Sequence, residues 1–198
     1  MISFMKPTLK RCSWPDQEDS LMIRYHDREW GNPVYNDHKL FEFLVLEAFQ
    51  AGLSWRTILH KRKNFRKAFR SFDFRKVARF GAQDRARLMQ DAGIVRNRLK
   101  IQAAIVNARL FMELRKEFGT FSKYMWTWVK GKPLVHRIKT IKEIPVVIPE
   151  AEAWAKDLKK RGFKFLGPTV LYAHMQAVGM VNDHQVSCFR HRQVGNRS

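Results

Sequence analysis

The apolar run at residues 40–53 predicts a helix at the centre of the protein. Its side chains are apolar on nearly every helical face: Leu40, Phe41, Phe43, Leu44, Val45, Leu46, Ala48, Phe49, Ala51 and Leu53. A helix that is apolar all round is buried in the core rather than laid on the surface. Gly52 is suited to end this helix, because glycine readily adopts the left-handed conformation of a C-cap. Other elements must therefore surround residues 40–51 on all sides.

One carboxylate, Glu47, interrupts this run. Helical spacing places it beside Phe43 and Leu44, inside the protein. A buried carboxylate needs a partner or a function, because an unpaired buried charge is costly. With Ser54 and Trp55 just beyond the glycine stop, Glu47 could belong to a pocket for a flat, polar ligand. A core helix with one salt-bridged glutamate explains the same residues equally well.

The rest of the chain also shows helical periodicity, and the predicted fold class is all-α. Helices are expected near residues 20–26, 36–51, 58–72, 74–80, 82–90, 99–118, 121–129, 149–161 and 168–178, with Leu99 on the apolar face of its helix. Residues 130–149 are expected to form a crossing loop, since no partner strand is evident elsewhere. The predicted organisation is a flexible basic arm at 1–10, one helical domain at 11–190 and a loose tail at 191–198. The domain could consist of two lobes with the active site between them.

The charge balance indicates a polyanionic partner. The 198 residues include 38 Lys and Arg against 18 Asp and Glu, a formal net charge of +20. Nucleic acid is the first candidate partner and an anionic membrane surface the second. No segment has the length and apolarity of a transmembrane helix, and the N-terminus does not resemble a signal peptide. We therefore expect a cytoplasmic protein without a membrane partner, whose two cysteines are reduced.

Residues 159–169 predict a hairpin between two helices. The segment reads K-K-R-G-F-K-F-L-G-P-T, with Gly162 placed to end one helix and Gly167–Pro168 placed to begin the next. Free N–H groups at the start of the second helix, surrounded by Lys159, Lys160, Arg161 and Lys164, suit a phosphate. Such a helix-hairpin-helix element holds a DNA backbone without reading bases. An ordinary corner between two helices remains the alternative.

Two cysteines and two histidines near opposite ends of the chain form a candidate metal set. Cys12 and His26 lie near the N-terminus, and His184 and Cys188 lie near the C-terminus. Two thiolates and two imidazoles complete a tetrahedral zinc site, which would be structural because no position is left for water. The spacing from 12 to 26 is not that of a zinc finger, so spacing alone leaves open two buried cysteines and two unrelated histidines.

Six motifs in order along the chain resemble one family, the bacterial DNA-3-methyladenine glycosylase I family. They are R-C-x-W at 11–14, Y-H-D-x-E-W-G at 25–31, L-E-x-x-Q-A-G-L-S-W at 46–55, D-A-G-I-x-R-N-R-x-K-I at 91–101, K-K-R-G-F-K-F-x-G at 159–167, and M-Q-A-x-G-x-V-N-D-H at 175–184 followed by Cys188. They span nearly the whole chain. The resemblance implies a helix-hairpin-helix DNA repair enzyme that hydrolyses the N-glycosidic bond of N3-methyladenine and leaves an abasic site. It also implies one structural zinc ion at Cys12, His26, His184 and Cys188.

The resemblance further implies roles for individual residues. Glu47 would be catalytic by stabilising positive charge on the flipped base, with Trp55 stacked on the cationic ring. Tyr25 and Trp14 would complete the base pocket. The remaining DNA contacts would come from Gly52 and Leu53, which fill the gap in the duplex, and from the hairpin at Lys160, Arg161, Gly162, Lys164, Gly167 and Thr169. Asp183 receives no catalytic role, and it is a candidate to support the neighbouring ligand His184.

The expected partner is double-stranded DNA containing alkylated adenine, bound by a monomer in the bacterial nucleoid. The main alternative is a zinc-stabilised DNA-binding protein or damage sensor that has no catalytic activity. A third possibility, a hydrolytic zinc enzyme, is disfavoured by a ligand set that leaves no open position.

Overall fold

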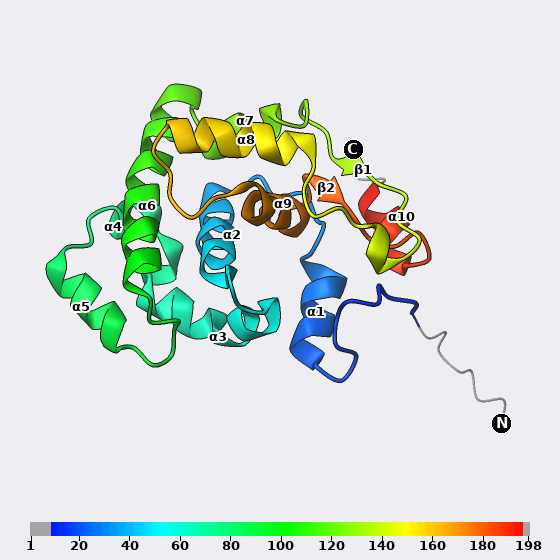
Figure 1. Cartoon of the computed structure of the whole chain (residues 1–198), viewed down its shortest axis with the longest axis horizontal. Coiled ribbons are helices and arrows are strands. Elements are labelled where there is room, and N and C mark those ends of the chain that lie inside the picture. Colours follow the sequence, from blue (N-terminus) through cyan, green and yellow to red (C-terminus); the bar gives the residue numbers. More distant parts are fainter. Residues whose placement is uncertain (1–8, 196–198) are drawn as a thin grey trace.

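The computed structural model describes residues 9–195, and helices dominate it (Figure 1). The helices are α1 (Ser20–Arg28), α2 (Asp37–Gln50), α3 (Trp55–Ala68), α4 (Phe74–Val77), α5 (Ala82–Gln90), α6 (Arg98–Phe118), α7 (Phe121–Thr127), α8 (Pro149–Lys160), α9 (Pro168–Ala177) and α10 (Phe189–Gly195). Short 3₁₀ turns occupy Arg70–Phe72 and Ile141–Glu143, and two-residue strands lie at β1 (Leu134–Val135) and β2 (Val181–Asn182). The prediction of an all-α fold is confirmed.

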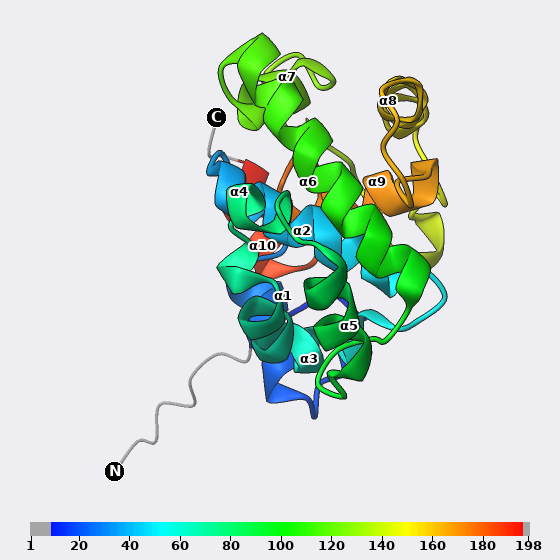
Figure 2. The same ribbon diagram turned by 90° about the vertical axis from the view of Figure 1, so that its left-hand side faces the viewer.

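Helix α2 is the centre of the molecule. Every residue from Leu40 to Phe49 is buried, and α2 contacts α3, α6, α7 and α9 (Figure 1). In Figure 2, α9 lies between α2 and α8, which agrees with the contacts of α9 to both of these helices. The apolar run therefore forms a helix enclosed by others, as its pattern requires.

Local signals in the sequence set the helix ends. The Asn36 side chain accepts a hydrogen bond from the Lys39 amide at 3.1 Å and caps α2, while Gly52 follows the last turn with a φ of +79°. The Ser54 hydroxyl caps α3 in the same way. Helix α3 is consequently a single helix from Trp55 to Ala68, whereas the expected helix near 58–72 starts later and includes the residues that form the 3₁₀ turn Arg70–Phe72.

Two details differ from the sequence-based expectations. β1 pairs in parallel with β2, with Leu134 opposite Val181, so the crossing loop at 130–149 does have a partner strand. A two-residue ladder has too few residues to show the alternation that identifies a strand. Leu99, which was expected on the apolar face of α6, is 68 % exposed.

The two ends of the described chain lie together. The orange β2 and the red α10 lie on the side of the molecule that also carries α1 (Figure 1), and the Phe189 amide donates to the Lys10 carbonyl at 2.8 Å. Residues 1–8 of the expected arm and 196–198 of the expected tail lie outside the described residues, whereas residues 191–195 lie within α10. No helix within residues 9–195 is long and apolar enough to cross a membrane.

Candidate active site

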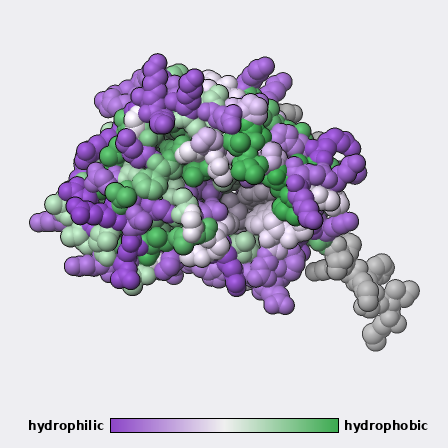
Figure 3. Space-filling model, viewed as in Figure 1, coloured by the Kyte–Doolittle hydropathy of each residue, from purple (hydrophilic) through white to green (hydrophobic). Residues whose placement is uncertain are grey.

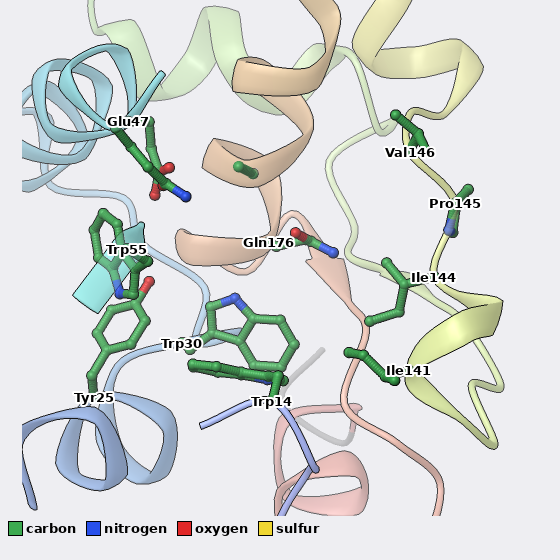
Figure 4. Close-up of a pocket in the computed structure, with 12 residues that line it drawn as sticks. Trp14, Tyr25, Trp30, Glu47, Trp55, Ile141, Ile144, Pro145, Val146 and Gln176 are labelled. Carbon is green, nitrogen blue, oxygen red and sulfur yellow. The ribbon is translucent and has the colours of Figure 1, made fainter. Parts of the chain in front are cut away.

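A cavity of about 420 Å³ opens between α1, α2, α9 and the loop that precedes α8 (Figure 4). The cavity is lined by the four residues that were predicted to contact the flipped base: Trp14, Tyr25, Glu47 and Trp55. They come from the segment before α1 and from α1, α2 and α3. Hydrophilic residues cover most of the face shown in Figure 3, which is hollowed near its centre. The fold thus brings side chains separated by up to 41 residues, from Trp14 to Trp55, to one concave site.

The carboxylate of Glu47 makes no direct contact with a charged group in the described part of the chain. Glu47 is only 4 % exposed, and no group within residues 9–195 forms a hydrogen bond or an ion pair with its carboxylate. Burial raises the pKa of Glu47 to about 8, and the charge of Arg62 partly opposes this shift. Arg62 itself is engaged with Glu42 at 2.7 Å and with Glu29 at 2.9 and 3.0 Å. The interpretation of Glu47 as a salt-bridged core residue therefore does not hold for the described residues.

Aromatic rings form the wall beside Glu47. The Tyr25 and Trp55 ring centroids lie 5.0 Å apart, and Trp14 meets Tyr25 edge-on at 6.2 Å. Burial, followed by the charge of Glu47, raises the pKa of Tyr25 well above its usual value, so its hydroxyl stays protonated. The indole N–H groups of Trp14 and Trp55 are buried without an acceptor among the described residues. One acid beside several ring faces is suited to a flat ligand that carries positive charge.

The four predicted metal ligands form one buried cluster. The donor atoms of Cys12, His26, His184 and Cys188 all lie within 4.8 Å of one another, and this group could hold a metal ion. The His184 Nδ1 atom lies 3.4 Å from the Cys12 Sγ atom and 3.6 Å from the Cys188 Sγ atom. The His26 Nε2 atom lies 3.5 Å from the Cys188 Sγ atom. The fold therefore brings together residues from opposite ends of the chain.

Both histidines of the cluster are oriented through their second ring nitrogen. The His26 Nδ1 atom lies 2.8 Å from a carboxylate oxygen of Asp27, and the His184 Nε2 atom lies 3.2 Å from the carbonyl of Trp30. Such outer contacts fix the ring orientation that a metal ligand needs. Asp183 does not make this contact with the His184 ring, so it is not the support that its position in the sequence suggested.

Gly52 and Leu53 lie on an exposed turn that a lysine holds in place. Leu53 is 43 % exposed, and its amide donates to the Gln50 carbonyl at 2.6 Å. Lys100, which is 7 % exposed, donates from Nζ to the Phe49 carbonyl at 2.9 Å and to the Ala51 carbonyl at 2.5 Å. The lysine thus satisfies carbonyls at the C-terminus of α2, where a cation is also favoured by the helix dipole. The turn is therefore anchored from the start of α6.

The predicted hairpin joins α8 to α9. Gly162 has a φ of +96°, which favours glycine, and Gly167 forms the N-cap of α9. The Asn107 side chain clamps the hairpin, because it accepts from the Lys164 amide at 2.8 Å and donates to the Lys164 carbonyl at 2.9 Å. Lys160, Lys164 and Thr169 are exposed.

Arg161 differs from the other residues predicted to contact DNA at the hairpin. Its guanidinium donates to Asp157 at 2.8 Å and to Glu117 at 2.7 and 3.1 Å. These contacts use the Nε, Nη1 and Nη2 atoms together. The geometry therefore favours Lys160 and Lys164 over Arg161 as the hairpin's phosphate contacts.

Several wall residues were missed by the sequence-based reasoning. They are Trp30, Gln50, Ile141, Ile144, Pro145, Val146, Ala173 and Gln176. Trp30, Gln50 and Gln176 lie within the motifs quoted above, which could have indicated them. The residues at 141–146 belong to the crossing loop, and no local pattern in that loop indicates a wall of the cavity.

Three comparisons with known proteins agree with this geometry. A family model described as methyladenine glycosylase matches residues 14–191. The DNA-3-methyladenine glycosylase 1 of Escherichia coli (strain K12) is 49 % identical over 180 residues, which cover 91 % of this chain and 96 % of that protein. A solved structure of 3-methyladenine DNA glycosylase I superposes with a TM-score of 0.88 at 47 % identity, covering 91 % of this chain and 98 % of that one.

A second solved structure bears on the ligand. It is a variant of 3-methyladenine DNA glycosylase I in complex with 3-methyladenine, with a TM-score of 0.85 and 38 % identity. The match covers 87 % of this chain and 92 % of that one.

Proposed function

This chain belongs to the methyladenine glycosylase family, and we propose that it excises N3-methyladenine from alkylated DNA by hydrolysing the N-glycosidic bond. The product would be an abasic site in the DNA and a free methylated base. The protein would thus perform the first step of base-excision repair.

One observation carries this proposal: Glu47 is a buried carboxylate in an aromatic cavity, and no group within residues 9–195 forms a hydrogen bond or an ion pair with it. A purely structural role would leave an unfavourable charge or a protonated acid in the core without compensation. A cationic base placed in the cavity supplies the missing positive partner. N3-methylation gives adenine a positive charge, so the lesion itself provides the complementary group.

The chemistry follows from this charge. In the proposed reaction the bond between the sugar C1′ and the base N9 breaks, and its electron pair neutralises the positive base. A water oxygen forms the new bond to C1′ and loses a proton, which gives the sugar hydroxyl. Because the base leaves as a neutral molecule, little acid catalysis is required. The binding groups retain the cation in the flipped position, with Trp55 and Tyr25 supplying ring faces and Glu47 supplying the opposite charge.

The ionisation of Glu47 is coupled to the ligand. In the empty cavity, burial raises the pKa of Glu47 to about 8, so most molecules carry a protonated acid at neutral pH. A cationic base at hydrogen-bond distance favours the carboxylate and lowers this pKa. Binding of the charged lesion would therefore release a proton from the protein.

We also propose that the buried cluster binds one zinc ion. A tetrahedral zinc site with Zn–S of about 2.3 Å and Zn–N of about 2.0 Å separates sulfur from nitrogen by roughly 3.5 Å. The three sulfur–nitrogen distances of 3.4, 3.5 and 3.6 Å fit that geometry. Four protein ligands leave no position for water, so such an ion would be a cross-link rather than a catalyst. This ligand set also argues against a hydrolytic zinc enzyme.

The proposed substrate is a duplex bound by a monomer in the bacterial nucleoid. In this proposal the exposed turn at Gly52 and Leu53 occupies the gap that a flipped nucleotide leaves, and its exposure supports this role. The hairpin presents Lys160, Lys164 and the N-terminus of α9 to the DNA backbone. The exposed turn at Gly52 and Leu53, together with the hairpin, supports a double-stranded substrate.

The decisive test is release of free base from alkylated duplex DNA, with 3-methyladenine and 7-methylguanine resolved by chromatography. We expect release of 3-methyladenine. No release by a folded, DNA-binding protein would favour the alternative of a damage sensor that has no catalytic activity.

Substitution of Glu47 tests its role. Glu47→Gln keeps the size of the side chain but removes its charge, and we expect release of 3-methyladenine to slow by about 10- to 100-fold, the range of one hydrogen bond to a charged group. Single-turnover kinetics would measure this effect. An unaltered rate would remove Glu47 from the reaction.

A further inference from the structure

Gln176 lies in the wall of the cavity and is held by a buried carboxylate. The Gln176 Nε2 atom donates to the Asp183 Oδ2 atom at 2.6 Å. Asp183 is 1 % exposed and has two further partners, the Tyr172 hydroxyl on Oδ2 and the His136 Nδ1 atom on Oδ1 at 2.6 Å. Tyr172 and Gln176 lie on one face of α9, whereas Asp183 follows β2 and His136 follows β1. The strand pairing therefore brings the parts of this network together.

This network fixes the orientation of the Gln176 amide. The Asp183 Oδ2 atom accepts from the amide nitrogen of Gln176, and Asp183 has no N–H group in its side chain to offer the amide oxygen. The oxygen is then directed away from Asp183. In Figure 4 the oxygen end of Gln176 lies on the side of Glu47 and Trp55, and the nitrogen end lies on the opposite side. No hydrogen bond within residues 9–195 uses the Gln176 side-chain oxygen. The cavity thus contains a fixed and unoccupied acceptor.

The chemistry of purines gives this acceptor a use. Adenine has an exocyclic amino group with two N–H donors, whereas guanine has a carbonyl oxygen at the same ring position. Glu47 can accept from one of the two N–H donors, which leaves the other without a partner. We propose that the Gln176 side-chain oxygen accepts a hydrogen bond from the exocyclic amino group of the flipped base and thereby selects alkylated adenine over alkylated guanine.

The inference rests on the proposed function and adds a specificity determinant to it. A guanine lesion in the same position would set its carbonyl oxygen against the Gln176 oxygen, two acceptors without a proton between them. A freely rotating glutamine could turn its N–H₂ group toward guanine, but the contact with Asp183 opposes this rotation. Asp183 and Tyr172 are positioning residues in this arrangement, because they act on the base only through Gln176.

The test is binding of two free bases to the whole protein, followed through the fluorescence of the cavity tryptophans. The probes are 3-methyladenine and 3-methylpurine, which differ only by the amino group. For the wild type we expect 3-methyladenine to bind more tightly than 3-methylpurine, because both Glu47 and the Gln176 oxygen can accept from its amino group. In Gln176→Leu this preference should fall about five- to tenfold, the effect of one lost hydrogen bond, while the affinity for 3-methylpurine stays within about twofold.

Two variants keep the test independent of folding. Gln176→Met has the length and flexibility of glutamine and replaces the leucine variant if that variant folds poorly. It should show the same reduction in the preference for 3-methyladenine over 3-methylpurine. Gln83→Leu changes an exposed glutamine of α5 away from the cavity and should retain the wild-type preference. Equal weakening of both bases, or an unchanged preference in both Gln176 variants, would overturn the inference.

A second measurement separates this inference from the proposed function. This measurement compares the wild type with Gln176→Leu in the release of 3-methyladenine and 3-methylguanine from alkylated duplex DNA. The ratio of released 3-methyladenine to released 3-methylguanine should fall several-fold in the variant. A wild type that releases no methylated base overturns the proposed function together with the inference. A wild type that releases 3-methyladenine, with an unchanged product ratio in the variant, overturns the inference alone.

Discussion

Glu47 and Asp183 are both buried carboxylates, and they differ in their hydrogen-bond donors. Asp183 accepts from three side chains, whereas Glu47 accepts from none within residues 9–195. Burial disfavours the charged form of a carboxylate that has no donors, and it raises the pKa of Glu47. Asp183 therefore suits a fixed structural role, and Glu47 suits a role in which a ligand supplies the missing charge.

The environment of Glu47 predicts a pH-dependent stability. The pKa of Glu47 is raised from 4.5 to about 8 in the folded protein, so the folded state holds a proton that the unfolded state loses between these values. This contribution to stability is complete below about pH 4.5 and is lost as the pH rises through about 8. Glu47→Gln cannot lose a proton, and we expect it to be more stable than the wild type by on the order of 5 kcal/mol at pH 9.

Urea unfolding at pH 5 and pH 9 would measure this effect. The two proteins should have similar free energies of unfolding at pH 5 and should diverge at pH 9. The same change at the exposed Glu113 is the control and should leave the pH profile unaltered. Parallel profiles for the wild type and Glu47→Gln would contradict the assignment of the raised pKa.

At the scale of elements, the end of α2 and the start of α6 form one unit. Lys100 joins them by donating to the Phe49 and Ala51 carbonyls directly before the turn at Gly52 and Leu53. Burial lowers the pKa of Lys100, and no carboxylate within residues 9–195 pairs with it. The lysine therefore acts through the backbone of the turn and not through an ion pair.

Replacing this lysine should uncouple DNA handling from base binding. In Lys100→Met the carbonyls at the end of α2 lose their donor, and we expect a loss of about 1–3 kcal/mol in the free energy of unfolding. Excision from duplex DNA should fall, because the turn that carries Leu53 is no longer fixed, while free 3-methyladenine still binds. Lys116→Met, on the exposed part of the same helix, is the matched control. Equal loss of base binding and excision would rule out this positioning role.

The hairpin makes a separate prediction about DNA affinity. Each phosphate neutralised by a cation contributes about −0.9 to the slope of log K against log salt concentration. Lys164→Ala should reduce the magnitude of this slope by about one. Arg161→Ala should leave the slope unchanged, because Glu117 and Asp157 already bind its guanidinium. Titration of duplex DNA at several salt concentrations would measure both slopes, and a larger change for Arg161→Ala would reverse this assignment.

At the scale of the whole molecule, the Cys/His cluster joins the two ends of the described chain. Cys12 and His26 meet His184 and Cys188 next to Trp30, whose indole lines the cavity. Trp30 contacts Trp14 at 5.0 Å and His184 at 4.6 Å between ring centroids. The cluster and the cavity therefore share a wall, and loss of the cluster should loosen the side of the cavity formed by Trp14.

Removal of the proposed zinc ion should destabilise the protein. We expect a chelator to lower the free energy of unfolding by several kcal/mol and to weaken binding of 3-methyladenine. Elemental analysis would give the metal content, and thermal unfolding with and without chelator would give the stability. Cys188→Ser should lower stability in the same way and show no further response to chelator. A metal-free purified protein with an unchanged unfolding temperature would contradict the proposal.

Local features of the sequence predicted much of this organisation. The apolar run at 40–49, the helix stop at Gly52 and the hairpin glycines depend on residue type and short spacing, so they could be predicted without coordinates. The family resemblance was equally accessible, because it rests on motifs. The same reasoning failed at Leu99 and at the pairing of β1 with β2, where packing between distant segments decides the outcome.

Residue types and their spacing were enough to predict a helical protein with a central buried helix, a Cys/His set and one acid directed to the interior. Three features depend on the folded chain: Glu47 has no hydrogen-bond or ion-pair partner within residues 9–195, Arg161 has partners, and Gln176 and the loop at 141–146 complete the cavity. These features involve segments that lie far apart along the chain. Whether a charge is compensated, and which atom of an amide faces a cavity, depend on residues brought together from remote segments, as Gln176 and Asp183 are with His136.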